Sequence, residues 1–452
     1  MTEKKLQFRD YLYVGSLLFG LFFGAGNLIF PVHLGQLAGS NVWWANLGFL
    51  ITGIGLPFLG VIAIGISRQK GILEVAKRIH PLYGTIFTAL LYLVIGPFFA
   101  LPRLASTSFA IALQPFVPSS TQKLILLLFS VAFFFGAYLF AKRPNKLLDY
   151  VGKFLNPLFL LLLFVLILFA FLKPLGSFNV TPTDAAYLTS PLNAGLKEGY
   201  NTLDALASLA FGIIIVTTLQ QMGVKQPKTI AKDTIKSGFI SIVIMGIIYT
   251  CLALMGTMSL GQFALSENGG IALAQLADHY LGTLGSILLA LIVIIACFKT
   301  AIGLITAFSE TFHEIFPQIS YGKWLIITSV LPAIFANVGL TNIIAGALPV
   351  LMFIYPLAIT LIFLVLTGPL FKERQCVYVS VTVFTLIAAL CDGLNALPLK
   401  LQSLPVIQDI LALAQHIPLF SIGMSWVVFM PIGLVVGLIL APFFPKKITK
   451  EA

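Results

Sequence analysis

Long apolar runs alternate with short polar connections along almost the entire chain. Most runs are about 20 residues long, the length at which an α-helix crosses the hydrocarbon core of a bilayer. The pattern predicts an all-α polytopic membrane protein with twelve transmembrane helices. These helices are expected at residues 10–33, 43–66, 82–114, 123–141, 150–172, 195–222, 235–259, 285–309, 323–338, 342–370, 376–396 and 417–444.

The positions of lysine and arginine agree with this number of helices. With the N-terminus in the cytoplasm, most of the 27 basic residues fall in inner connections or tails, as the positive-inside rule requires. The others are Lys123, Lys173, Lys197 and Lys400 in outer connections, and Arg103 and Lys299 inside helices. A missed or invented helix would scramble this division, so both termini are predicted to be cytoplasmic.

The composition excludes several other classes of protein. Apolar residues make up 59% of the 452 positions and charged residues only 10%, too few to cover a soluble protein of this size. The net charge of +11 follows from membrane topology, so the lipid bilayer is an expected partner and nucleic acid is not. The four cysteines are scattered and the five histidines lie far apart, which predicts no disulfide framework, no metal-ligand cluster and no cofactor.

The first predicted helix carries an interruption at mid-membrane. Gly20, Gly24 and Gly26 lie within seven residues, and Asn27 and Pro31 follow them. This composition disfavours a continuous helix, because glycine and proline are the residues with the lowest helix propensity.

The sixth predicted helix has a second polar stretch at membrane depth, with Asn201, Thr202, Asp204 and Ser208. Either stretch alone fits close helix packing through small residues. The two lie five helices apart, however, so the segments that contain them would have opposite orientations in the membrane. Paired interruptions of this kind are typical of transporters built from inverted repeats, with the substrate at the breaks.

Two broken helices of this kind offer a site for a zwitterion. The N-terminus of a half-helix presents free N–H groups and a positive dipole end to a carboxylate. Carbonyl groups released by an unwound stretch can accept from an ammonium group or bind a cation. Apolar neighbours such as Phe22, Leu206 and Phe211 favour a substrate with an aliphatic side chain.

Five parts of the sequence resemble motifs of the bacterial branched-chain amino-acid carriers of the BrnQ type. They are FGAGNLIFP at 23–31, IGP at 95–97 with LPR at 101–103, EGY at 198–200 with DALA at 204–207, ACF at 296–298 with TAIGL at 300–304, and LPVL at 348–351 with YPL at 355–357. The resemblance therefore extends over nearly the whole chain.

The resemblance implies import of leucine, isoleucine and valine across the plasma membrane of a bacterium, by symport with H⁺ or Na⁺ and alternating access. It also implies the LeuT-like fold of the amino acid–polyamine–cation superfamily. Residues 10–172 and 195–370 would form two inverted five-helix repeats, and residues 376–444 two peripheral helices. The oligomeric state stays open.

The resemblance also assigns roles to single residues. Substrate-binding residues would be Gly24, Ala25, Gly26 and Asn27 in the first helix, Ala205, Leu206 and Ser208 in an unwound stretch of the sixth, and Leu304 in the eighth. Ion-coupling residues would be Gly20, Phe23, Ala296, Lys299 and Thr300. Lys299 departs from the LeuT-like pattern, which has a small hydroxyl residue at this position.

Lys299 lies near the middle of the bilayer, where a lysine costs about 2.5–3.5 kcal/mol on insertion scales. Beside the carbonyl groups of Gly20 and Phe23, its ammonium would act as a tethered cation in place of sodium. Proton coupling is therefore favoured, with Na⁺ at the same site as the alternative. A lysine on the lipid face, reaching toward the cytoplasmic surface with sodium coupling retained, is the other interpretation.

Arg103 and Asp204 are predicted to form an outer gate. A charged residue inside a span is usually paired or faces water. Asp204 is the expected partner of Arg103, with Asp392 or the outer lipid headgroups as alternatives.

Other functions compete with this interpretation. A carrier of the same fold for another neutral amino acid or a nucleobase is the nearest one, since a fold does not fix its substrate. A membrane enzyme would need clustered catalytic side chains, and a channel would carry rings of charge or a repeated filter. The sequence has neither pattern, so no enzymatic activity is expected.

Overall fold

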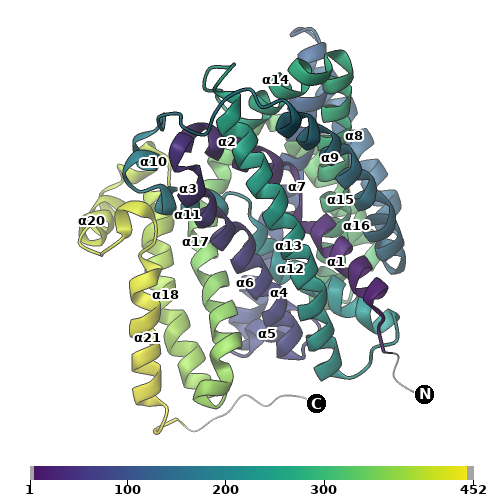
Figure 1. Cartoon of the computed structure of the whole chain (residues 1–452). Coiled ribbons are helices and arrows are strands. Elements are labelled where there is room, and N and C mark those ends of the chain that lie inside the picture. The colour runs from purple at the N-terminus through teal and green to yellow at the C-terminus, as the bar shows by residue number, and fades with distance from the viewer. Residues whose placement is uncertain (1–4, 445–452) are drawn as a thin grey trace.

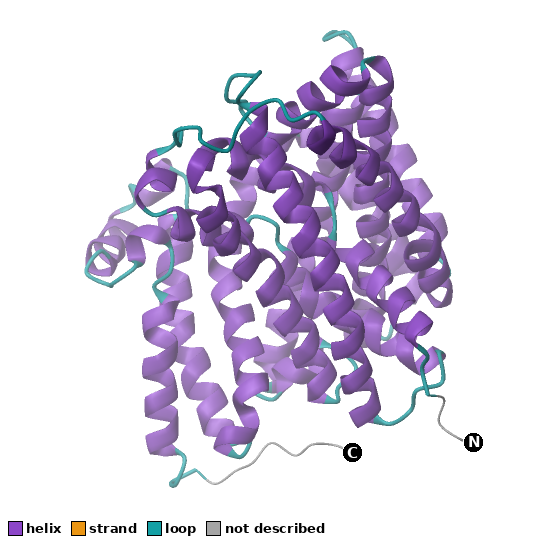
Figure 2. Cartoon of the chain, viewed as in Figure 1, coloured by secondary structure: helices purple, strands orange, loops and turns teal. Residues whose placement is uncertain are grey.

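The chain folds into a bundle of long helices that run from one end of the molecule to the other (Figure 1). The computed structural model describes residues 5–444, apart from the side chains of residues 340–342, 344 and 345. Every regular element within this range is helical, with no strand (Figure 2). Ten helical segments there are long and apolar enough to cross a membrane. The all-helical membrane fold is thus confirmed, whereas the number of twelve spans stays a prediction.

Apart from a short helix at Ile72–Lys77, the helices of the first half fall on the predicted spans. They are α1 (Phe8–Phe22), α2 (Ala25–Ala38), α3 (Val42–Leu50), α4 (Leu56–Ser67), α5 (Ile72–Lys77), α6 (Pro81–Leu93), α7 (Ala100–Ala112), α8 (Gln122–Ala141) and α9 (Asn156–Leu172). Three π-helical stretches join or precede some of them, at Ile51–Gly55, Val94–Phe98 and Leu148–Leu155.

The second half also has long helices on the predicted spans, with shorter helices in the predicted connections between them. Its helices are α10 (Ala185–Thr189), α11 (Pro191–Tyr200), α12 (Asp204–Gln221), α13 (Pro227–Ser259), α14 (Gly269–Leu281), α15 (Thr283–Ile315), α16 (Tyr321–Phe335) and α17 (Leu340–Thr367). The C-terminal part adds α18 (Gln375–Asn395), α19 (Leu399–Gln402), α20 (Pro405–Ala414) and α21 (Trp426–Leu440). Helices α18 and α21 lie side by side at one edge of the bundle (Figure 1).

Some boundaries differ from the predicted spans. Helix α13 begins eight residues before the predicted residue 235. Helix α21 begins at Trp426 instead of residue 417, because Leu419 and Gly423 adopt positive φ angles of 65° and 70° that interrupt a helix.

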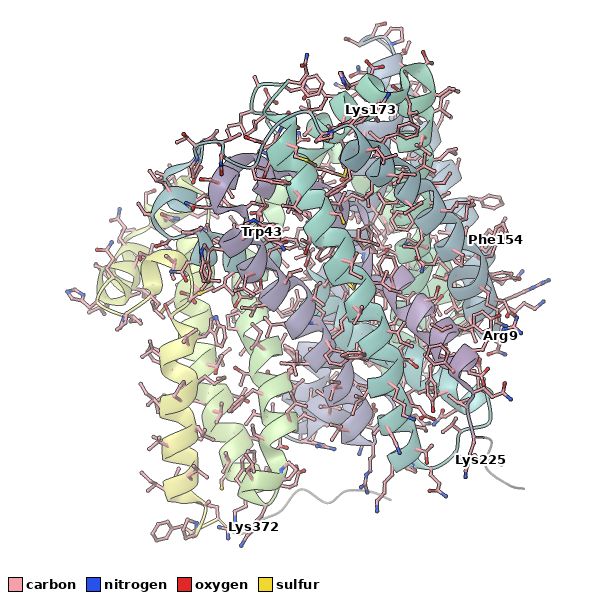
Figure 3. The ribbon with its side chains drawn as sticks, viewed as in Figure 1. Arg9, Trp43, Phe154, Lys173, Lys225 and Lys372 are labelled. Atoms are coloured by element: carbon pink, nitrogen blue, oxygen red, sulfur yellow. The ribbon has the colours of Figure 1, made fainter. Side chains whose placement is uncertain are left out.

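Apolar side chains cover the flanks of the bundle. Phe154 and Trp43 are 65% and 56% exposed, and Figure 3 shows both between the two ends of the bundle. Lys225 and Lys372 lie at one end of the molecule and Lys173 at the other (Figure 3), as the predicted inner and outer connections require. A flank of this kind suits lipid hydrocarbon and not water. The terms inner and outer below follow the predicted orientation.

Helices α2 and α13 cross with their backbones in contact. A Cβ built on Gly35 would lie 1.9 Å from the carbonyl oxygen of Ala253, and one on Gly256 would lie 2.0 Å from that of Val32. Each glycine thus faces a main-chain carbonyl of the other helix, so neither position has space for a side chain. This is the small-residue packing expected between membrane helices.

Candidate functional site

The first predicted span is two helices, separated inside the bundle. Helix α1 ends at Phe22, Phe23 and Gly24 are non-helical, and α2 starts at Ala25. Gly24 is extended (φ −98°, ψ −165°), and its N–H donates to Oδ1 of Asn27 at 3.0 Å. The predicted interruption of the first helix is therefore present, and Asn27 caps the new helix from within its own first turn.

The sixth predicted span is also broken, at a different place from the prediction. Helix α11 ends at Tyr200 and α12 starts at Asp204, with Leu203 between them in a left-handed conformation (φ 68°). The prediction that Ala205, Leu206 and Ser208 lie in the unwound stretch is wrong, because all three are in the first turns of α12.

Ser208 packs away from the break. Its hydroxyl donates to the carbonyl oxygen of Ala205 at 2.7 Å. A Cβ built on Gly60 of α4 would lie 1.9 Å from Oγ of Ser208, so this serine fills the α4–α12 contact. The small residues in this stretch therefore serve helix packing, which was the alternative interpretation of the sequence.

A buried hydrogen-bond network connects the two breaks. Nδ2 of Asn27 donates to Oδ2 of Asp204 at 2.5 Å and also to the hydroxyl of Tyr249 on α13. The Tyr249 hydroxyl donates in turn to the same oxygen of Asp204 at 3.4 Å. These three residues are at most 3% exposed. The start of α2 and the start of α12 are thus fixed to each other by side chains.

A narrow cavity, here called the inner cavity, lies between the two breaks. It is lined by the α1–α2 break, α7, the α11–α12 break and α15. Its polar lining includes Asn27, Arg103 and Asp204. Its apolar lining includes Phe211 and Leu304.

Several of the predicted substrate residues line the inner cavity, and others do not. Those that line it are Gly24, Ala25, Gly26, Asn27 and Leu304, together with Thr300 from the predicted ion site. Ala205, Leu206 and Ser208 are buried but absent from the lining. Thr202, Leu203 and Ala207 take their places, one turn or less away.

Arg103 and Asp204 both line the inner cavity, yet no ion pair within 4.0 Å joins them in the described structure. Asp204 is held by Asn27 and Tyr249, and Nη1 of Arg103 donates to the carbonyl oxygen of Asn201 at 3.3 Å. The predicted direct gate pair is thus not formed in this conformation. Asp392, the alternative partner, instead accepts a hydrogen bond from Ser425 at 2.7 Å.

Lys299 is fully buried between α1, α9 and α15. Its Nζ donates to Oδ1 of Asn156 at 3.0 Å and lies 3.9 Å from the ring centroid of Phe159. The rings of Phe19 and Phe23 lie 4.8 Å and 5.5 Å away. The interpretation of Lys299 as a lipid-facing lysine is therefore wrong.

The predicted ion-coupling residues divide between two places. Gly20 and Phe23 lie near Lys299, since a Cβ on Gly20 would be 3.4 Å from Cβ of Asn156. Thr300 faces Gly24 at the inner cavity, and its hydroxyl donates to the carbonyl oxygen of Ala296 at 3.3 Å.

Asn156 and Tyr249 are the central polar residues that the sequence interpretation missed. Nδ2 of Asn156 donates to Ser16 Oγ at 2.9 Å, and Ser16 donates to the carbonyl oxygen of Gly152 at 2.6 Å. Lys299 is thereby connected through Asn156 to the inner half-helix α1. For Asn156 the available signal was a polar residue that precedes a long apolar run, whereas Tyr249 stands beside Thr250 in a span with several other hydroxyl residues and gave no distinct signal.

A second and wider cavity, the outer vestibule, lies beyond the inner cavity. It is lined mainly by α17 and by the segment that leads into α21, with further residues from α11 and Arg103 from α7. The lining includes Tyr200, Tyr355 and Trp426. Arg103 and Leu203 line both cavities and therefore mark the boundary between them. The C-terminal helices lie at the edge of the bundle but still contribute Trp426 to the vestibule.

Comparison with known proteins identifies the family of the chain. A family model described as branched-chain amino acid transport protein matches residues 7–444. The chain belongs to this family. The branched-chain amino acid permease BrnQ of Lactobacillus delbrueckii subsp. lactis is 46% identical over 94% of this chain and 95% of its own length. BrnQ of Bacillus subtilis (strain 168) is 42% identical over 98% of this chain and 99% of its own length. The resemblance seen in the sequence is confirmed, and membership of this permease family identifies a transport protein and not an enzyme.

Solved structures share the fold of this family member at low sequence identity. MhsT in complex with L-phenylalanine matches with a TM-score of 0.58 and 15% identity, over 97% of this chain and 100% of that one. Mhp1, a nucleobase-cation-symport-1 family transporter, matches with a TM-score of 0.53 and 12% identity, over 96% and 93%. The expected LeuT-like transporter fold is confirmed by these matches.

Proposed function

We propose that this chain imports leucine, isoleucine and valine across the bacterial plasma membrane as an ion-coupled symporter that works by alternating access. The observation that carries the proposal is the inner cavity, where the polar ends of two broken helices meet an apolar wall. The family relationship supports the substrate class. The carboxylate would lie at the first turn of α2, at Gly26 and its neighbours, and the aliphatic side chain against Phe211 and Leu304.

The proposed architecture follows the predicted one. Twelve spans would form two inverted five-helix repeats, residues 10–172 and 195–370, with residues 376–444 at the edge and both termini in the cytoplasm. The breaks at Phe23–Gly24 and Asn201–Leu203 then fall in the first helix of each repeat. This is the arrangement in which transporters place their substrate site.

We place ion coupling at Lys299 and favour protons. The ammonium is held by a neutral amide, Asn156, and by aromatic rings. Ring faces stabilise a cation when water is absent. Two of the three rings belong to Phe19 in α1 and to Phe23 directly after it. Movement of α1 would therefore take these two rings away from the ammonium. Lys299 would then release its proton toward the cytoplasm, which couples the charge on the lysine to the position of α1.

Uptake into proteoliposomes tests the proposed function. Counterflow of labelled leucine, with isoleucine and valine as competitors, is expected from the purified protein. A nucleobase or a different neutral amino acid that exchanges while leucine does not would instead establish the alternative carrier.

Imposed gradients test the coupling ion. An inward proton gradient is expected to accumulate leucine without sodium. Accumulation driven by a sodium gradient alone, and unchanged when the pH gradient is collapsed, would contradict proton coupling at Lys299.

A further inference from the structure

The inner cavity contains two opposite charges that do not neutralise each other directly. Arg103 and Asp204 line it from α7 and from the start of α12. Among the described residues neither takes part in an ion pair within 4.0 Å. Separated charges in a low-dielectric cavity are costly unless each finds a partner of opposite sign. The cavity therefore favours a ligand that carries both charges.

The guanidinium of Arg103 lies beside the first turn of α2. A Cβ built on Gly26 would be 3.5 Å from Nη2 of Arg103. The first-turn N–H groups of a helix lack partners within that helix. A carboxylate at Gly26 could therefore accept from the α2 backbone and from Arg103 together. Arginine suits this task because its planar fork matches the geometry of a carboxylate.

The carboxylate of Asp204 lies on another side of the same cavity. Its hydrogen bonds from Asn27 and Tyr249 both end on Oδ2. A carboxylate offers about four acceptor positions on its two oxygens, so these two bonds leave capacity for a further donor. The side chain is 3% exposed, which excludes most compensation by bulk water. An ammonium group of the ligand would provide the missing positive charge.

The coupling lysine does not compete for this role. Lys299 is absent from the lining of the inner cavity, and its ammonium faces Asn156 and Phe159 on α9. The coupling charge is therefore buried outside the lining of the cavity proposed for the substrate.

We propose that Asp204 receives the α-ammonium group of the substrate while Arg103 and the first turn of α2 receive its α-carboxylate. This pair of contacts makes the site selective for zwitterionic α-amino acids over the amines and carboxylic acids with the same side chain. The inference rests on the proposed function and assigns Arg103 and Asp204, expected as a gate pair, to substrate recognition. Asn27 and Tyr249 are positioning residues, because they act through Asp204.

Three probes separate the two contacts in the purified protein. They are leucine, 4-methylpentanoate, which lacks the ammonium group, and 3-methylbutylamine, which lacks the carboxylate. Each is measured as an inhibitor of labelled leucine or by its direct effect on thermal stability. Wild-type protein is expected to prefer leucine over either analogue by about 10- to 100-fold, the value of one charge-assisted hydrogen bond.

Variants of Asp204 then test the assignment of the ammonium. Asp204→Asn is expected to lower the affinity for leucine about 10- to 100-fold and to change the affinity for 4-methylpentanoate by less than about threefold. The preference for leucine over this analogue would then be lost. Asp204→Glu keeps the charge and is expected to keep the preference. Asp392→Asn, on α18 and outside the cavity lining, is the matched control for loss of a buried carboxylate.

The complementary variant tests the carboxylate contact. Arg103→Gln is expected to remove the preference for leucine over 3-methylbutylamine and to leave the preference over 4-methylpentanoate less affected. Tyr249→Phe removes one hydrogen bond to Asp204 and leaves both charges in place, so it is expected to weaken binding of leucine less than Asp204→Asn does and to leave binding of 4-methylpentanoate unchanged.

The outcomes distinguish this inference from the proposed function. An equal loss of leucine and 4-methylpentanoate binding in Asp204→Asn would assign Asp204 a structural role only and overturn the inference. Wild-type protein that binds none of the three probes would overturn the proposed function itself. If Asp204→Asn does not fold, Arg103→Gln provides an independent test. A preference for leucine over 3-methylbutylamine that is unchanged in this variant would overturn the assignment of the carboxylate to Arg103.

Discussion

The ammonium of Lys299 on α15 donates a hydrogen bond of 3.0 Å to the side-chain oxygen of Asn156, the first residue of α9. The same asparagine donates to Ser16 of α1. One amide therefore joins the buried cation to the inner half-helix. A change in the charge of Lys299 alters the strength of the first bond, since bonds to charged groups are stronger than neutral ones.

Replacing this amide by a carboxylate should block coupling. In Asn156→Asp, the new carboxylate would form a buried ion pair with Lys299. Loss of the proton from Lys299 would leave that carboxylate buried without a partner, which costs several kcal/mol, roughly the penalty for breaking a buried ion pair. Lys299 would therefore stay charged. Accumulation of leucine in a proton gradient is expected to fall at least about tenfold. Exchange of leucine without net ion movement should persist, and it is measured as counterflow in the same vesicles.

Lys299→Met tests the same coupling site by a second route. It removes the titratable group and retains an apolar chain of similar length next to Phe19 and Phe159. Both variants should lose the response to pH and keep counterflow. Gradient-driven accumulation at the wild-type level in either variant would move the coupling site elsewhere.

Gly26→Ala should impair substrate binding without loss of the fold. The added Cβ would lie 2.9 Å from Cε2 of Phe30 and 3.5 Å from Nη2 of Arg103, so it occupies the space proposed for the carboxylate. Leucine affinity is expected to fall by about tenfold, and Gly26→Leu is expected to abolish uptake while the protein still inserts. Affinity is measured by binding of labelled leucine. Gly322→Ala is the control, because no heavy atom lies within 4 Å of its added Cβ, and equal effects in both variants would refute the steric explanation.

Trp426→Ala should affect capture of the substrate more than its translocation. This indole lines the outer vestibule, where it provides apolar surface beyond Arg103 and Leu203. A rise in KM by about three- to tenfold with little change in the maximal rate is expected from the loss of that surface. Trp44→Ala, at a residue 61% exposed on the flank of α3, serves as control. A fall in maximal rate at unchanged KM would indicate a role in helix movement instead.

Gly35→Ala should destabilise the protein. Its Cβ would overlap the carbonyl oxygen of Ala253, so α2 and α13 would have to separate. Overpacking of this kind costs about 1–3 kcal/mol and is expected to lower the thermal midpoint by several degrees. Gly282→Ala is not a suitable control because its φ is positive, but Gly322→Ala is. An unchanged midpoint would mean that the crossing can relax without cost.

The sequence was sufficient for the fold and for part of the site. Apolar runs of membrane length and the division of basic residues predicted the helices, since both follow from the energetics of lipid. Gly24 and Asn27 marked the first break because glycine and a buried amide are unfavourable within a membrane helix unless they have a specific role.

The second break was placed a few residues too late for a physical reason. The resemblance places the unwound stretch at Ala205, Leu206 and Ser208, but Ser208 fills the contact with Gly60 of α4. The residue that turns the chain is Leu203, which has a positive φ although it is not glycine. Such a conformation depends on the surrounding tertiary structure, so local propensity does not predict it.

The partners of Lys299 and Asp204 were missed for a related reason. Asn156 and Tyr249 are far from them in sequence, and a polar residue in a membrane span has many equivalent explanations. Only the packing of α9 and α13 against the broken helices selects the pairings that occur.

The glycine crossing of α2 and α13 determines which part of the broken helix is mechanically free. Because Gly35 and Gly256 each press against a carbonyl of the opposite helix, α2 cannot turn about its axis or slide without carrying all of α13 with it. Helix α1 has the two non-helical residues Phe23 and Gly24 between itself and that rigid pair. Under the proposed alternating access, the break is the place where α1 can change its angle to α2 without disturbing the α2–α13 crossing.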